Sequence, residues 1–97
     1  MIVKQLVNKN QFVIIDEGRI FFQSYQSLIA YINKYGDLTL FNDWCYSKTT
    51  LKHLKIFLID NIWEGKSQID WNKPFKNQIS KLIKLGVILR EEDYKNE

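Results

Sequence analysis

The sequence is organised around one stretch, Trp44-Cys45-Tyr46-Ser47-Lys48-Thr49-Thr50, and the amphipathic run at residues 51–63 that follows it. One face of this run is apolar and consists of Leu51, Leu54, Leu58 and Ile62. Their spacing of three or four residues is that of one side of an α-helix. Ser47, Thr49 and Thr50 can each cap the helix N-terminus, because a side-chain hydroxyl can accept a backbone N–H. The pattern predicts that the most buried helix of the protein begins here and ends at Trp63-Glu64-Gly65.

Upstream of this stretch, the sequence predicts an antiparallel meander of three short strands at residues 1–7, 11–16 and 19–23. Asn8-Lys9-Asn10 supplies the first turn, because asparagine tolerates a positive φ. Asp16-Glu17-Gly18-Arg19 is typical of a tight reversal with Gly18 in the left-handed conformation. Apolar side chains occupy both faces of the second and third strands, so we expect the sheet to be covered on part of both sides.

Residues 25–35 are predicted to form the first helix. Their apolar side chains fall at helical spacing, with Ser24 as the N-cap and Gly36 at the C-terminal end. The β-prone segment Leu38-Thr39-Leu40-Phe41 predicts a fourth strand, which Asn42-Asp43 ends.

The C-terminal third is predicted to contain one more helix. Residues 66–71 form either a short strand or an irregular loop. Asn72-Lys73-Pro74 favours a helix start, because asparagine can cap and proline needs no N–H in the first turn. We predict a third helix from here to Leu85, a last short strand at residues 87–89, and a frayed acidic tail at residues 91–97. The expected fold is one compact α+β domain over residues 1–97, in the order β-β-β-α-β-α-α-(β).

The composition is that of an ordinary globular domain. Of the 97 residues, 45% are hydrophobic, which argues against disorder. The longest apolar runs contain four or five residues, far short of the roughly 18 that span a bilayer, so no membrane association is expected. No signal-peptide pattern is visible, and we expect a cytoplasmic location. Cys45 is the single cysteine, which excludes an intramolecular disulfide.

Residues suited to catalysis or metal binding are scarce. His53 is the only histidine and lies eight positions after Cys45, and a zinc site would need a second pair of ligands. A Cys45–His53 nucleophilic pair with Asp43 or Asp60 as orienter can be drawn. A small buried cysteine beside a tryptophan and a histidine on the helix surface are the simpler interpretation. The four glycines fall at predicted turns or helix ends and form no phosphate-binding loop. We expect a protein that is not an enzyme and holds neither metal nor cofactor.

Positive charge is concentrated in the middle of the chain. Residues 48–84 contain eight lysines and three acidic residues, a net charge of +5. The candidate lysines for binding a partner are Lys48, Lys52, Lys55, Lys73, Lys76, Lys81 and Lys84. A basic face of this kind attracts an acidic protein or a nucleic acid. The alternative is that the lysines only solvate the outer faces of two amphipathic helices.

Two tryptophans, Trp63 and Trp71, are further candidates for a partner surface. Tryptophan anchors many protein interfaces, because it buries a large area at low entropic cost. The alternative is that both side chains complete a small core.

The predicted order from residue 25 onward, helix, strand, helix, helix, strand, matches a winged helix-turn-helix. Its basic third helix would contact phosphates through lysines. Residues 63–72 are, however, much longer than the roughly 3–4-residue turn of that motif. Only Asn77 and Gln78 of the third helix could read base edges. A small basic DNA- or RNA-binding regulator is therefore our second hypothesis.

Two segments resemble a known group of proteins. Phe22-Gln23-Ser24-Tyr25-Gln26-Ser27-Leu28-Ile29-Ala30 resembles an F-x-S-Y-x-x-x-I-A pattern, and residues 44–58 resemble W-x-Y-S-x-T-T-x-x-x-L-x-x-F-L. Both patterns are similar to small proteins of bacteriophages and mobile elements in low-GC bacteria. The resemblance covers about residues 12–60 and implies a setting, but it assigns no catalytic or ligand residue.

The resemblance, the scarcity of catalytic groups and the basic face lead to our main hypothesis. We expect a non-enzymatic protein that docks on a host protein, or on a host nucleoprotein complex, and inhibits it. A defence nuclease of the CRISPR type, blocked in an anti-CRISPR-like manner, would be one such partner. The sequence leaves the identity of the partner and the oligomeric state open.

Overall fold

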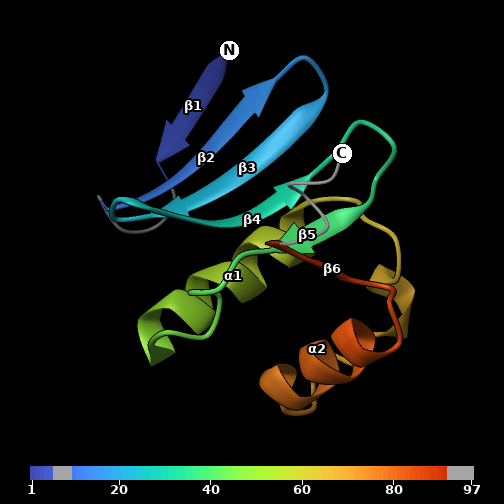
Figure 1. Ribbon diagram of the computed structural model, residues 1–97. Helices are drawn as coiled ribbons and strands as arrows, with labels where there is room; N and C mark the ends of the chain where they lie inside the picture. Colours follow the sequence, from blue (N-terminus) through green and yellow to red (C-terminus); the bar gives the residue numbers. More distant parts are fainter. Residues whose placement is uncertain (6–9, 92–97) are drawn as a thin grey trace.

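The computed structural model describes residues 1–5 and 10–91. In these residues the chain forms one mixed β-sheet with two α-helices and one 3-10 turn (Figure 1). The strands are β1 (Ile2–Gln5), β2 (Gln11–Asp16), β3 (Arg19–Ser24), β4 (Ser27–Ile32), β5 (Leu38–Leu40) and β6 (Leu89–Arg90). The helices are α1 (Lys48–Asp60), the 3-10 turn η1 (Lys66–Gln68) and α2 (Phe75–Lys84). The mixed α and β class is confirmed, with two α-helices in place of the three predicted.

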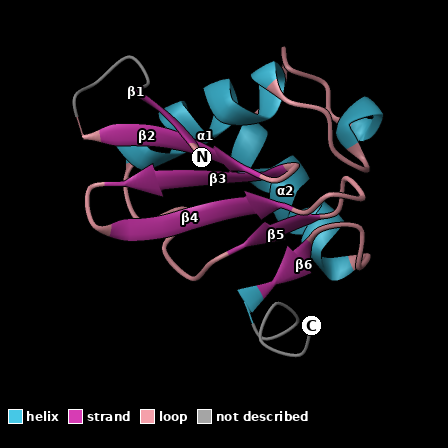
Figure 2. Cartoon of the chain, turned by 90° about the horizontal axis from the view of Figure 1, so that it is seen from above, coloured by secondary structure: helices cyan, strands magenta, loops and turns pink. Residues whose placement is uncertain are grey.

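The strands lie in the sheet in the order in which they occur along the chain. β1 to β5 form an antiparallel meander, whereas β6 pairs parallel to β5. Parallel neighbours need a crossover connection, and this one contains α1, η1 and α2. Both α-helices lie on the same side of the sheet (Figure 1; Figure 2). One face of the sheet therefore packs against the helices.

The prediction of a helix at residues 25–35 is wrong, because this segment contains β4. Strand β4 pairs antiparallel with β3 on one side and with β5 on the other. Tyr25 has a φ of +55° in the tight β3–β4 turn, so Ser24 ends a strand and caps no helix. Residues 29–32 are buried without a break, and the spacing of such a run does not separate a central strand from a helix. The element order of a winged helix is therefore absent from the described part of the chain.

Several other predicted elements are confirmed. The β2–β3 reversal has positive φ at both Glu17 (+52°) and Gly18 (+80°), as two-residue hairpins favour. Helix α1 begins after Ser47, whose Oγ accepts the backbone N–H of Thr50 at 3.1 Å. The helix ends at Asp60, three residues before the predicted end. Helix α2 also occupies its predicted segment.

The ends of the chain test the sequence predictions only in part. The strand expected at residues 1–7 is confirmed as β1 within residues 1–5. Residues 6 and 7 of that strand, and residues 8 and 9 of the expected turn, lie outside the described residues. The acidic tail lies outside them from residue 92 onward. Glu91 is described, and it accepts a hydrogen bond from Nδ2 of Asn42 at 2.6 Å. Within the described residues, neither α1 nor α2 has the length and apolarity that crossing a bilayer requires.

The core lies between the sheet and the two helices. Its most deeply buried side chains include Phe22, Leu38, Leu54, Phe57, Leu58 and Ile79. The rings of Phe22 in β3 and Phe57 in α1 stack with their centroids 5.5 Å apart. Complete burial of a side chain of this size contributes about 1.5–3 kcal/mol. On the opposite face of the sheet, Phe21 stacks on Tyr31 at 4.7 Å, so apolar contacts occur on both faces, as the sequence predicts.

The loop after α1 is fixed to the sheet at one junction. The backbone N–H of Glu64 donates to the carbonyl oxygen of Gly36 at 2.8 Å, which ties this loop to the β4–β5 turn. Gly65 follows with a φ of +90°, and a Cβ at this position would overlap Cγ1 of Val87. The junction therefore needs glycine both for its backbone conformation and for the space beside Val87.

We expect Gly65→Ala to destabilise the protein more than Gly86→Ala. Both glycines have positive φ, but nothing lies within 4 Å of a Cβ built on Gly86. Gly86→Ala should lower the free energy of unfolding by about 1 kcal/mol, because it only places an alanine in the left-handed conformation. Gly65→Ala adds the overlap with Val87, about 1–3 kcal/mol more. Urea unfolding measures both free energies, and equal losses would contradict the steric argument.

Two carboxylates meet at the same junction. A hydrogen bond with Asp37 raises the pKa of Glu64 above its ordinary value, and the negative charge of Asp37 raises it further. Asn33 holds Asp37 in place, because its Oδ1 accepts the backbone N–H of Asp37 at 3.0 Å. When both carboxyls are ionised, their repulsion opposes the closed junction.

We expect Glu64→Gln to raise the melting temperature near neutral pH. A raised pKa means that the folded state holds the proton more tightly than the unfolded state, so this carboxyl stabilises the fold below the ordinary pKa of about 4.3. That contribution is lost as the pH rises through the raised pKa. The advantage of Glu64→Gln should therefore shrink on acidification, which thermal melts across a pH series measure. An advantage that is independent of pH would contradict the coupling to Asp37.

Candidate functional site

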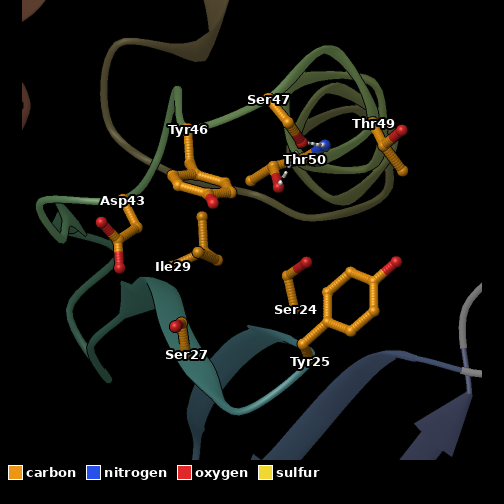
Figure 3. Close-up of a pocket in the computed structure, with 9 residues that line it drawn as sticks. All are labelled: Ser24, Tyr25, Ser27, Ile29, Asp43, Tyr46, Ser47, Thr49 and Thr50. Atoms are coloured by element: carbon orange, nitrogen blue, oxygen red, sulfur yellow. Dashed lines mark hydrogen bonds between the residues drawn. The ribbon is translucent and has the colours of Figure 1, made fainter.

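A hollow of about 520 Å³ lies between the β3–β4 turn and the N-terminus of α1 (Figure 3). We call it the hydroxyl pocket. Its lining residues on the sheet side are Ser24, Tyr25, Ser27 and Ile29. Those on the α1 side are Asp43, Tyr46, Ser47, Thr49 and Thr50. All but Asp43 belong to the two segments, residues 22–30 and 44–58, that carry the resemblance described above.

Ser24 is the most unusual residue of this pocket. It is only 3% exposed, and its hydroxyl has no hydrogen-bond partner within residues 1–5 and 10–91. Its cross-strand neighbour Gln11 is completely buried, and neither polar atom of its side-chain amide has a partner in the described part of the chain. Figure 3 shows the Ser24 side chain pointing into the space between β3 and the first turn of α1. A buried polar group without a partner costs about 1–3 kcal/mol, so these two side chains lower the stability of the fold.

The first turn of α1 forms the opposite wall. Ser47 is the N-cap, and its hydroxyl lies 3.1 Å from Oγ1 of Thr50 as well as accepting the N–H of that residue. The first N–H groups of a helix have no acceptor within the helix and carry its positive dipole end. The carboxylate of Asp43 lies in the same wall, and none of the lining residues that the structure describes is a lysine or arginine. The pocket therefore contains a positive helix end and a negative side chain together.

Cys45 and His53, the pair considered for nucleophilic chemistry, have separate places in the structure. Cys45 is half-buried in the loop before α1. His53 is buried on the inner side of α1, so the prediction that it lies on the helix surface is wrong. Nδ1 of His53 lies 2.8 Å from the carbonyl oxygen of Thr49, which can only accept, so Nδ1 carries the proton. This hydrogen bond gives His53 a structural role within α1. In the described part of the chain, no group of three or more histidine, cysteine or acidic residues could hold a metal ion.

Six of the seven candidate lysines lie on the two helices, and Lys73 lies just before α2. On α1, Lys48, Lys52, Lys55 and Ile59 follow one another at intervals of four, three and four residues, which places them along one side of the helix. We call these four residues the α1 stripe. Ile59 is 43% exposed, although it is a large apolar side chain. Lys55 is half-buried, and its Nζ donates to the carbonyl oxygen of Trp71 at 3.2 Å.

The remaining lysines lie at or on α2. Lys73 forms an ion pair with Asp70 at 3.9 Å. Lys76, Lys81 and Lys84 are exposed, opposite the buried Ile79 and Leu82 of the same helix. They form no ion pair with another described residue. Both helices cover the same side of the sheet (Figure 2), so the exposed lysines of both lie in one layer.

The two candidate tryptophans differ in exposure. Trp63 is 4% exposed and belongs to the core, where its indole Nε1 donates to the carbonyl oxygen of Leu58 at 2.9 Å. The core alternative therefore describes Trp63 better than the interface alternative. Trp71 is half-buried and its ring stacks on Phe75 at 6.1 Å. Trp71 therefore contacts both helices, through its ring on Phe75 of α2 and through its carbonyl oxygen on Lys55 of α1.

A family model described as "Family of unknown function (DUF8033)" matches residues 1–73. The chain belongs to this family. No curated protein and no solved structure matches the chain. The family match contains the hydroxyl pocket and the α1 stripe, whereas Lys76, Lys81 and Lys84 lie beyond its end. If members share a binding site within the matched region, α1 and the pocket are better candidates than the lysines of α2.

The sequence patterns do not predict the hydroxyl pocket, because they assign Ser24 and the hydroxyls of residues 47–50 only to helix caps. The feature that could have indicated it is the abundance of hydroxyl side chains in the two segments, seven of which are among the described lining residues. Only the strand pairing of β4 with β3 brings the two segments to one place.

We expect Ser24→Ala and Ser47→Ala to have opposite effects on stability. Removing the unpartnered Ser24 hydroxyl leaves no acceptor unsatisfied, so stability should be unchanged or higher by up to about 1 kcal/mol. Removing the Ser47 cap should cost about 1 kcal/mol. Chemical denaturation of both variants measures the difference. A loss for Ser24→Ala as large as that for Ser47→Ala would show that the Ser24 hydroxyl has a partner in the fold.

Proposed function

We propose that the protein is a non-enzymatic binding protein that docks on an acidic surface of a host protein through the α1 stripe and inhibits that host protein. The observation that carries the proposal is the combination of basic and apolar side chains along one exposed side of a helix. Lys48 and Lys52 are exposed and form no ion pair with another described residue, and Ile59 continues their line. A lysine and an apolar side chain that share one face suit an interface with an apolar centre and a charged rim.

The chemistry of the stripe favours a protein over a nucleic acid as the partner. Phosphate backbones are bound mainly through cationic and hydrogen-bonding groups. Ile59, which is 43% exposed, would face such a backbone without a favourable contact. Buried against an acidic protein surface, the same side chain would leave water and contribute to affinity.

The proposed setting is a bacteriophage or mobile element of a low-GC bacterium, acting inside a host cell. It rests on the resemblance of residues 22–30 and 44–58 to proteins of such elements. A nuclease of a defence system, such as a CRISPR nuclease, is the kind of host protein that this setting suggests. The basic stripe would then occupy an acidic surface, or the groove through which the nuclease reaches its substrate.

Affinity purification from a low-GC bacterial host tests the proposal. We expect wild type to retain a specific host protein and Lys48→Glu/Lys52→Glu/Ile59→Asp to lose it. The matched control is Lys76→Glu/Lys81→Glu/Lys84→Glu, which reverses three charges on α2 outside the family match and should retain the partner. The purified partner should lose activity when mixed with an equimolar amount of wild type but not of the stripe variant.

Two results would contradict the proposal. One is recovery of the same host proteins with wild type and with the stripe variant. The other is a shift of duplex DNA or RNA by the wild type that weakens steeply with salt and disappears in the α2 variant, because it would favour the nucleic-acid alternative. A partner that binds without loss of its activity would remove inhibition from the proposal and leave docking in place.

A further inference from the structure

We propose that the hydroxyl pocket binds a small neutral polyhydroxylated molecule of the carbohydrate class. The site is distinct from the α1 stripe and goes beyond the proposed docking function. The two sites use different sides of α1, so each can be tested without the other.

The size and openness of the hollow suit a small ligand. Its volume, about 520 Å³, lies in the range of pockets that bind small molecules, roughly 300–1,000 Å³. Tyr46 is 82% exposed and Tyr25 is also exposed, and both line the pocket. Exposed aromatic rings can pack against the C–H faces of a sugar ring, because a tyrosine has an apolar ring and a polar hydroxyl. Ile29 adds an apolar surface to the sheet-side wall.

The charges of the pocket favour a neutral ligand. An anion would be attracted by the N-terminus of α1 but repelled by the carboxylate of Asp43. A cation would be attracted by Asp43 but repelled by the helix end. A neutral polyol meets neither repulsion, because its hydroxyls donate to the carboxylate and accept from N–H and O–H groups. Of the described lining residues, seven carry a hydroxyl. Ser47 and Thr50 already bond to each other, and the other hydroxyls can donate to and accept from a polyol.

The buried Ser24 hydroxyl indicates that the pocket is completed by a polar ligand. It is more than nine-tenths buried, has no hydrogen-bond partner among the described residues, and points into the pocket (Figure 3). A ligand hydroxyl that reaches Ser24 would satisfy a group that the fold leaves unsatisfied. Because an unpaired buried group is costly, this hydrogen bond should contribute strongly to discrimination between ligands.

Titration of the full-length, isotope-labelled protein followed by amide NMR spectra tests the inference. The probes are glucose, ribose and N-acetylglucosamine as neutral sugars, inorganic phosphate as the anion and choline as the cation. We expect at least one sugar to cause saturable shifts confined to residues 24–29 and 43–50, with a dissociation constant of about 1 mM. Phosphate and choline should cause no saturable shift there at about 50 mM, a concentration well above that constant.

Three variants make the test specific. Ser24→Ala should weaken sugar binding roughly tenfold, and its own spectrum shows whether the fold is intact. Tyr46→Ala should also weaken it, whereas Tyr35→Ala, an exposed tyrosine that lies outside the pocket, should not. Asp43→Asn should retain sugar binding and gain a response to phosphate, because the repulsive charge is removed.

The outcomes are decisive in both directions. Saturable sugar shifts that weaken in Ser24→Ala support the inference. No response to any of the three sugars, or a response to phosphate or choline alone in wild type, overturns it. A sugar response that is unchanged in Ser24→Ala places binding elsewhere and also overturns it.

Discussion

The fold depends on one short parallel pairing, between β5 and β6. Thr39 pairs with Leu89, and Leu40 pairs with Arg90, so residues 41–88 must leave the sheet edge and return to it in the same direction. Both α-helices belong to that connection and lie on the same face of the sheet. The core, the junction at Gly65 and the outward direction of the α1 stripe all follow from this crossover. The antiparallel meander of β1 to β5 supplies the surface on which it packs.

Local chemistry accounts for much of the fold. The β2–β3 turn, a hydroxyl cap before α1 and the apolar face of α2 are each encoded within a few residues, so the sequence alone predicts them. The predicted apolar face of α1 is confirmed at Leu54 and Leu58. It is wrong at Ile62, which lies beyond the helix end and is 87% exposed. β4 is different, because residues 29–32 are buried on both faces of the sheet and therefore lack the alternation that marks a half-exposed strand. Pairing with β3 and β5 decides its conformation, and that information lies outside the segment.

The candidate site was hidden for the same reason. A helix at residues 25–35 would make Ser24 its cap, and this prediction does not place Ser24 beside α1. As a strand, β4 returns beside β3 and leaves Tyr25 in a tight turn opposite the start of α1. Helix α1 then has three roles: its inner side fills the core, its outer side presents lysines and Ile59, and its N-terminus closes the hydroxyl pocket. The lysines could be placed on helix surfaces from the sequence, but the burial of Trp63 required the structure.

The parallel pairing also determines the order in which the protein can fold as it is synthesised. The meander and α1 are made first, but β5 keeps an unpaired edge until Leu89 and Arg90 emerge. During that interval the backbone of β5 is open to pairing with other chains. Closure of the long connection must precede the contacts that stabilise it, and such non-local closure is slow. The last strand is only two residues long, yet its pairing with Thr39 and Leu40 covers the edge of β5 that the meander leaves open.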